Sequence, residues 1–193
     1  KPDMKLSDLY PYILPHLIGV PLPMVDLYIR QAARTFFLGT HAWVMDVDAF
    51  VYQDDASEYD LGISPGAEVA KVLSVTSGDS DYTKNVRLVG DDTLMFDEHS
   101  GPGNGATVDV QLALAPRVGD PAKTWSLPAD LDRFVPELAN GTLAAAFAKV
   151  DGQAGLAKFY GARFANDINT CGLKESRKRS GRRVSRGTTT QFF

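Results

Sequence analysis

The stretch that decides the fold, residues 22–51, reads LPMVDLYIRQAARTFFLGTHAWVMDVDAFV. In its first part, apolar residues recur at spacings of three and four, which is typical of one face of an amphipathic helix. The stripe consists of Val25, Tyr28, Ile29, Ala32, Phe36, Thr40 and Trp43. Pro23 suits the first turn, because the N–H that proline lacks has no partner there. We therefore predict a helix over residues 22–43.

From residue 44 onward the apolar pattern has a period of two. Val47, Ala49 and Val51 alternate with Asp46 and Asp48, and residues 69–75, 86–96 and 108–115 show similar alternation. Gly-Asp-Asp at residues 90–92 is a hairpin signal, and SGPGNG at residues 100–105 is typical of a loop. These patterns predict about five antiparallel strands in a small sandwich or barrel-like sheet.

The pattern becomes helical again after the sheet. One helix is expected over residues 127–137, with Pro136 kinking or dividing it, and a second over residues 138–150. A third is expected to run to about Arg179, and its stripe is formed by Leu156, Tyr160, Phe164, Ile168 and Cys171. Beyond Ser180 the Gly, Arg, Ser and Thr composition cannot build a packed core.

We therefore predict an α+β protein in which a helical core contains an inserted antiparallel β domain. The core consists of a long N-terminal helix plus C-terminal helices, and an extended C-terminal arm follows it. The predicted helical core comprises residues 1–43 and 119–179, the β insertion residues 44–118, and the arm residues 180–193.

Composition narrows the class of protein. The chain is 44% apolar and 23% charged, an ordinary soluble composition, and no apolar run approaches the ~20 residues of a membrane helix. We expect no membrane partner. The single cysteine, Cys171, excludes an intrachain disulfide and a cysteine metal cluster, and its place on a helical stripe predicts a small core residue.

The net charge of −4 hides an asymmetry along the chain. Residues 174–186 hold seven basic residues and one acidic residue, whereas the rest of the chain holds thirteen basic and twenty-three acidic residues. The acidic body therefore has a net charge of −10, and the segment of residues 174–186, which leads into the arm, has a net charge of +6. A segment with this charge favours binding to a negatively charged partner.

Three interpretations of the arm are open: a solvated tail, a segment that docks into an acidic protein surface, and a nucleic-acid-binding tail. Arginine outnumbers lysine five to two, which favours bidentate pairing with carboxylates. The same cations bind phosphates, and phenylalanine stacks on bases. The candidate docking residues are Lys174, Arg177, Lys178, Arg179, Arg182, Arg183, Arg186, Phe192 and Phe193.

Other chemistry-bearing residues give no catalytic pattern. The acidic residues Asp46, Asp48, Asp54, Asp55, Asp79 and Asp81 lack the spacing of a calcium-binding loop and suggest a solvated strand face and turns. His16, His41 and His99 are scattered among different predicted elements. We expect no catalytic residue, no cofactor and no metal, although an enzyme site in the β region stays open as a third hypothesis.

Several helical segments resemble the head-to-tail adaptor (connector, or neck) proteins of tailed bacteriophages. The likeness lies in LSDLYPYILP (6–15), GVPLP (19–23), AARTF (32–36), LANGTLA (138–144) and LAKFYGARF (156–164), ahead of a basic tail that ends in an aromatic residue. It covers about half of the chain, and the β region has no counterpart. Relatives often carry Pro-Trp before the last helix, where this chain has DGQAG (151–155).

The resemblance implies a structural virion protein and not an enzyme. Such adaptors form a homo-oligomeric ring, commonly dodecameric, beneath the portal protein, with the C-terminal segment often inserted into the portal. The ring extends the DNA channel without sequence-specific binding and provides the surface for tail or nozzle proteins. The expected location is the virion neck, after assembly in the host cytoplasm. The alternative is a nucleic-acid-binding protein that uses the basic tail.

Overall fold

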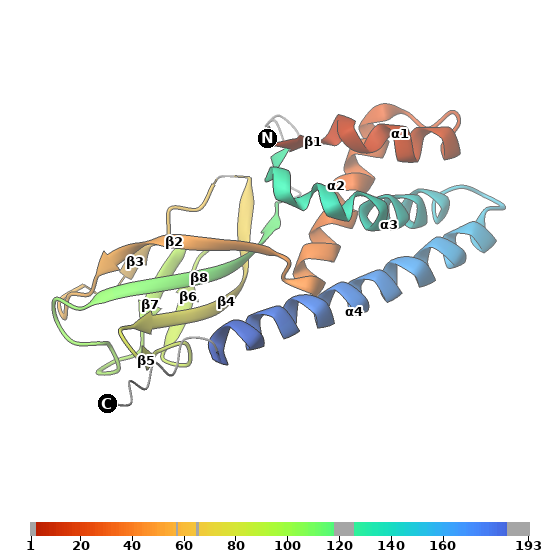
Figure 1. The fold of residues 1–193 in the computed structure, drawn as a ribbon. Coiled ribbons are helices and arrows are strands. Elements are labelled where there is room, and N and C mark those ends of the chain that lie inside the picture. Colours follow the sequence, from red (N-terminus) through yellow and green to blue (C-terminus); the bar gives the residue numbers. More distant parts are fainter. Residues whose placement is uncertain (1–2, 57, 65, 118–125, 185–193) are drawn as a thin grey trace.

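The computed structural model describes residues 3–56, 58–64, 66–117 and 126–184, without the side chains of Ser126 and residues 181–184. Helical elements lie at one end of the molecule and two sheets at the other (Figure 1). The helical elements are η1 (Leu6–Leu9), α1 (Tyr10–Ile13), η2 (Leu14–His16), α2 (Leu22–Thr40), η3 (Ala129–Phe134), α3 (Val135–Phe147) and α4 (Ala154–Val184). The strands are β1 (Met4–Lys5), β2 (Trp43–Val51), β3 (Glu58–Asp60), β4 (Ala67–Ser77), β5 (Ser80–Asp81), β6 (Val86–Val89), β7 (Thr93–Phe96), β8 (Thr107–Pro116) and β9 (Ser126–Leu127). The mixed α/β composition and the antiparallel sheets are confirmed.

The N-terminal part differs from the predicted long helix. It begins with strand β1 and the short turns η1, α1 and η2, so a long N-terminal helix as the leading element is not confirmed. Helix α2 ends at Thr40, and Trp43 starts β2. His41 is the cause, because its left-handed backbone (φ 53°) lets its N–H cap the Phe37 carbonyl at 2.9 Å and ends the helix.

Strands β2 to β8 form two antiparallel sheets, and β9 pairs with β1 in a separate two-stranded sheet. One has the order β2-β8-β4-β5 and the other β3-β7-β6. The rings of Phe50 on β2 and Tyr59 on β3 stack with centroids 4.5 Å apart, so aromatic side chains join the sheets. The described residues contain seven strands here, more than the five expected, because β3 and β5 are too short to show alternation.

Two local predictions in the sheet region are confirmed. The hairpin at Gly90 joins β6 to β7, with Val89 opposite Thr93 and Gly90 at a φ of 69°. On β8, Val108, Val110, Leu112 and Leu114 are buried on the face that the period-two pattern predicted. Residues 97–106 form the expected loop between β7 and β8.

The C-terminal helices begin and end at positions other than those predicted. The expected helix over residues 127–137 is instead β9, the 3-10 turn η3 and the start of α3. Pro136 lies in the first turn of α3, which begins at Val135, and does not kink it, because the first turn needs no N–H from proline. Helix α4 continues past Arg179 to Val184, so the predicted arm starts inside a helix; residues 185–193 lie outside the described residues.

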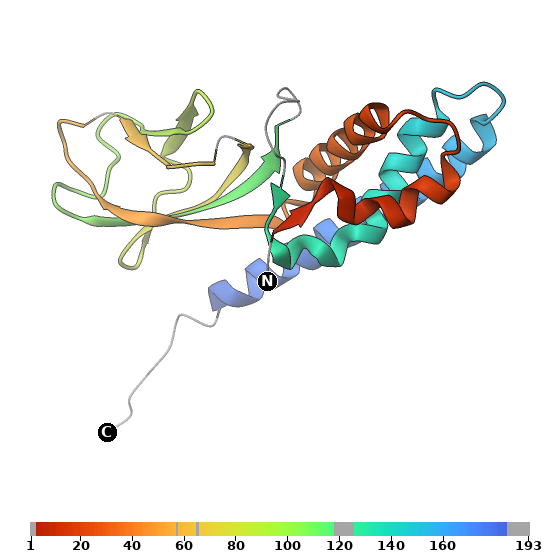
Figure 2. The ribbon, with the colours of Figure 1, turned by 90° about the horizontal axis from the view of Figure 1, so that it is seen from above.

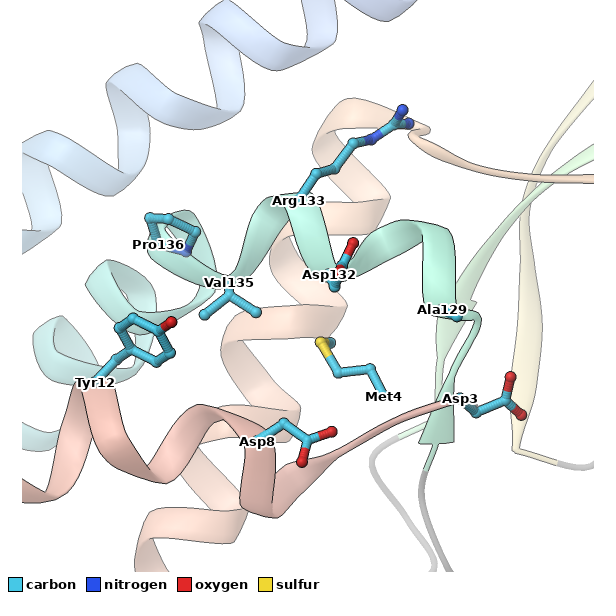
Figure 3. Close-up of a pocket in the computed structure, with 9 residues that line it drawn as sticks. All are labelled: Asp3, Met4, Asp8, Tyr12, Ala129, Asp132, Arg133, Val135 and Pro136. Atoms are coloured by element: carbon cyan, nitrogen blue, oxygen red, sulfur yellow. The ribbon is translucent and has the colours of Figure 1, made fainter. Parts of the chain in front are cut away.

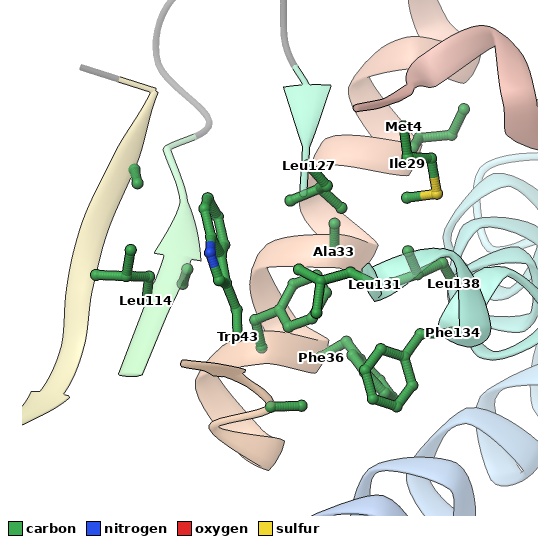
Figure 4. Packing of buried hydrophobic residues seen from close by; sticks show 14 of the residues in the cluster. Met4, Ile29, Ala33, Phe36, Trp43, Leu114, Leu127, Leu131, Phe134 and Leu138 are labelled. Carbon is green, nitrogen blue, oxygen red and sulfur yellow. The ribbon is translucent and has the colours of Figure 1, made fainter. Parts of the chain in front are cut away.

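One hydrophobic core connects the helices to the sheet (Figure 4). Phe36 and Phe37 on α2 are fully buried, and their rings contact Phe134 at centroid distances of 5.1 and 6.1 Å. Trp43 lies beside Phe37 at 6.1 Å and pairs with Leu114 across the strands. The helical and β parts therefore pack against each other through aromatic residues at the α2–β2 junction.

Helices α3 and α4 form an antiparallel pair, and the C-terminal end of α4 lies on the sheet side of the molecule (Figures 1 and 2). An ion pair of 2.7 Å between Arg34 on α2 and Glu68 on β4 also crosses from the helices to the sheet. Among the described residues, no helix is both long enough and apolar enough to cross a membrane.

Candidate docking surface

Helix α4 is held against the core by aromatic side chains along its first half. Tyr160 stacks on Phe147 of α3 with ring centroids 5.8 Å apart, and Phe164 stacks on Phe36 at 6.3 Å. Ile168 and Cys171 continue this face, and Cys171 is buried. The predicted stripe is therefore confirmed from Tyr160 onward. Leu156 is 42% exposed, because it lies in the first turn of α4 beyond the main packing.

Glycines bring α4 close to its neighbours. A Cβ atom on Gly141 of α3 would lie 2.7 Å from the Phe164 ring, and one on Gly39 of α2 would lie 2.7 Å from Cγ2 of Ile168. Both distances are below any normal contact, so only glycine fits without a shift. Close packing on two helices fixes the direction in which α4 leaves the core.

Two polar contacts fix the helix beyond Cys171. Arg179 Nη1 donates a hydrogen bond of 2.9 Å to the backbone carbonyl of His41. Glu175 Oε1 accepts a hydrogen bond of 2.7 Å from Lys178 and lies 3.7 Å from Nη2 of Arg133 in η3. The basic end of α4 is therefore attached to the α2–β2 junction and to η3.

The predicted docking residues fall into four groups. Lys174, Arg177 and Lys178 are exposed, and their i, i+3, i+4 spacing places them on one side of α4. Arg179 is partly buried and serves the contact with His41, which is a structural role. Arg182 and Arg183 belong to α4, but their side chains are outside the described part. Arg186, Phe192 and Phe193 lie outside the described residues.

His41 has a lowered pKa at this junction. Burial is the largest cause, and the charges of Lys71 and Arg179 act in the same direction, because each disfavours the protonated imidazole. A neutral His41 avoids repelling Arg179, the residue that its carbonyl binds. The junction is thus electrostatically compatible with a helix end that carries several cations.

The other candidate residues stay separate or exposed. Asp46, whose Oδ1 accepts a hydrogen bond of 2.8 Å from Gln111, and Asp48 lie on the solvent-facing side of β2. His16, His41 and His99 belong to η2, the α2–β2 junction and the loop after β7. Among the described residues, no group of three or more His, Cys, Asp or Glu side chains could hold a metal ion. Burial raises the pKa of the Cys171 thiol, which fits its predicted core position.

Sequence reasoning missed Arg133 and Glu175 as anchors of the helix end. Glu175 appeared only as the single acid in a basic segment, and its side chain is 13% exposed. The available signal was the presence of a single glutamate within a run of cations. Arg133 gave none, because a contact across 42 residues of sequence cannot be read from local spacing.

No family model matches this sequence, and no curated protein matches it. The likeness to neck adaptors therefore stays a prediction carried by the residues that show it.

Proposed function

We propose that this chain is a structural head-to-tail adaptor of a tailed bacteriophage. In this proposal, copies form a ring, expected to be dodecameric, under the portal protein. The ring extends the DNA channel and presents the surface on which tail or nozzle proteins assemble. The protein would act in the virion neck after assembly in the host cytoplasm, without catalysis.

The observation that carries the proposal is the exposed cationic face of α4 formed by Lys174, Arg177 and Lys178. Glu175 and Arg179 hold this part of the helix in place, so less side-chain and backbone freedom is lost when a partner binds. A helix face of this kind favours an acidic protein surface, where arginine pairs with carboxylates in a bidentate manner.

The charge of the body supports a protein partner over nucleic acid. Outside residues 174–186 the net charge is −10, which repels the DNA backbone and also repels other copies of the chain. We therefore propose that the portal serves as the template on which the ring assembles. Residues 1–43 and 119–179 would form the ring body, and the β insertion of residues 44–118 would contact the capsid, the tail or a neighbouring copy.

The test compares two double charge reversals. Lys174→Glu with Arg177→Glu reverses the proposed docking face, and Lys149→Glu with Lys158→Glu changes the net charge equally at exposed positions far from it. We expect the first variant to bind the purified portal at least tenfold more weakly, which corresponds to ~1.4 kcal/mol. The control should bind like the unmodified chain.

The same variants separate the two candidate functions. If the arm binds nucleic acid, the docking-face variant loses DNA retention in a gel shift, with a salt slope lowered by about 0.9 for each phosphate contact removed. Equal portal binding by both variants, or DNA binding lost while portal binding is kept, would refute the docking role.

A further inference from the structure

The solvent-facing side of α2 carries no charged residue. The structure describes all of α2, and its charged residues turn elsewhere. Arg30 is buried, Arg34 pairs with Glu68 on β4, and Asp26 accepts a hydrogen bond from Tyr10. A surface helix ordinarily presents charged residues to water. The outer side of α2 instead has a neutral line of exposed residues, here called the α2 stripe: Met24, Leu27, Gln31, Thr35 and Gly39.

The outer side of α4 has a similar neutral line ahead of the cationic docking face. Its exposed residues at spacings of three and four form the α4 stripe: Phe159, Ala162, Asn166, Asn169 and Leu173. The two large apolar residues lie at its ends, where Phe159 is 53% exposed and Leu173 is 61% exposed. Since Lys174 follows directly, the α4 stripe ends where the docking face begins. One helix can therefore contact two partners without overlap.

The two stripes match in length and lie on different sides of the helical part. At ~1.5 Å per residue, the α2 stripe spans about 22 Å and the α4 stripe about 21 Å. Both helices turn their buried sides toward the core, and Figures 1 and 2 place α2 behind α3 and α4 below it. Two separate faces on one copy are what a head-to-tail contact between copies requires.

Charges beside the stripes favour pairing of α2 with α4 over pairing of like helices. The α4 stripe is bordered by Lys158 and Arg163, and the Arg163 guanidinium lies 5.5 Å from the centre of the Phe159 ring. The α2 stripe is bordered by the carboxylate of Asp26, whose hydrogen-bond partner Tyr10 carries no charge. Two α4 stripes face to face would bring cations together, whereas α2 against α4 brings opposite charges together.

We propose that the α2 stripe of one copy packs on the α4 stripe of the next copy. This contact rests on the proposed function, because a ring needs an interface between copies, and it names that interface. Head-to-tail contacts close into rings when the rotation between copies allows it. Neutral faces let copies of net charge −4 meet with little repulsion. Ala162 and Gly39 have little or no side chain, so the two helix axes can approach closely.

The rival site for the α4 stripe is a groove of about 520 Å³ between the N-terminal segment and η3–α3 (Figure 3). Its lining combines apolar residues with Asp3, Asp8, Asp132 and Arg133. Covering these charged side chains with a neutral helix face removes water from them without supplying new partners, which is unfavourable. The α2 stripe has no such cost, because its exposed residues are uncharged.

Cysteine cross-linking tests the contact in the free chain. In a Cys171→Ala background, one chain carries Gln31→Cys and another carries Asn166→Cys. Each position lies near the middle of its stripe, so the pair reacts whether the two helices run parallel or antiparallel. The mixture is oxidised in about 0.5 M NaCl, which screens repulsion between the acidic bodies. We expect the mixed disulfide to form roughly tenfold faster than either disulfide between identical chains, because bound stripes raise the local thiol concentration.

Two matched substitutions and a groove probe complete the test. Leu27→Lys in the Gln31→Cys chain places a cation against the cationic border of α4 and should slow the mixed disulfide at least fivefold, to about the level of unspecific collision. Val89→Lys on β6 is the control, because Leu27 and Val89 are both 37% exposed, and it should leave the rate unchanged. A chain with Asp8→Cys reports on the groove.

Three results would overturn the proposal. They are equal rates for the mixed and the identical pairs, faster reaction of the Asn166→Cys chain with Asp8→Cys than with Gln31→Cys, and no effect of Leu27→Lys. The portal is absent from all of these reactions, and none of these substitutions changes the docking face. The contact between copies can therefore fail while portal binding stands, and portal binding can fail while this contact stands.

Discussion

Substituting Gly141 by alanine tests the packing that directs α4. Alanine gains about 1 kcal/mol over glycine in a helix interior. At this position, however, the new Cβ would meet three Phe164 ring atoms at 2.7, 2.7 and 2.9 Å. The ring cannot retreat freely, because it stacks on the fully buried Phe36 at 6.3 Å. Forcing a methyl group into such a packed core costs about 1–3 kcal/mol.

Gly161→Ala is the matched control, because Gly161 lies inside α4 and a Cβ there meets no atom within 4 Å. It should stabilise the protein by up to about 1 kcal/mol through helix propensity alone. Gly141→Ala should therefore be less stable than Gly161→Ala by about 1–3 kcal/mol in urea unfolding followed by circular dichroism. Equal stability of the two variants would show that α3 and α4 are not packed as closely as the Phe164 contact requires.

Three further measurements examine the core and the titrating groups. Phe36→Ala should lower the free energy of unfolding by about 3–5 kcal/mol, since the ring is fully buried; a loss below ~1 kcal/mol would contradict its central position. The hydrogen bond of 2.7 Å to Asp26 raises the pKa of Tyr10 to about 12, so its stabilisation is complete below pH 10 and is lost as the pH rises toward 12. Asp26→Asn should return the Tyr10 pKa toward 10 in an ultraviolet titration. An unchanged pKa would show that the hydrogen bond to Asp26 is not what raises it. Burial and two nearby cations lower the pKa of His41 from 6.5, so its contribution to stability is present above pH 6.5 and is lost as the pH falls through the lowered pKa; a proton NMR titration with a midpoint at or above 6.5 would refute this.

Periodicity predicted the parts of the fold in which one face of an element is buried. The stripe on α2 is confirmed from Val25 to Thr40, and the alternation on β8 is confirmed from Thr107 to Leu112, because one face is buried there. From Leu112 onward both faces of β8 are buried, so the alternation predicted for Ala113 and Ala115 is wrong. The predictions were wrong where local backbone geometry, or pairing with a strand distant in the sequence, determines where an element begins and ends. The left-handed residue His41 ends α2 early, and β9 forms through pairing with β1, more than 120 residues away in the sequence.

The candidate site was predictable only in its charge. The sequence identified a basic segment, but it did not separate Arg179, which binds the His41 carbonyl, from the exposed Lys174 and Arg177. That distinction depends on the angle at which α4 crosses α2. Gly39 allows this close crossing, because a Cβ there would lie 2.7 Å from Cγ2 of Ile168 on α4. Spacing along one helix contains no information about such a crossing.

The most direct test of the docking role is an image reconstruction of the neck region that resolves the portal, this chain and the tail. The account predicts a ring of copies under the portal, with Lys174 and Arg177 within ion-pair distance of portal carboxylates. A reconstruction in which this face of α4 contacts solvent or DNA, or in which the chain is absent from the neck, would contradict it.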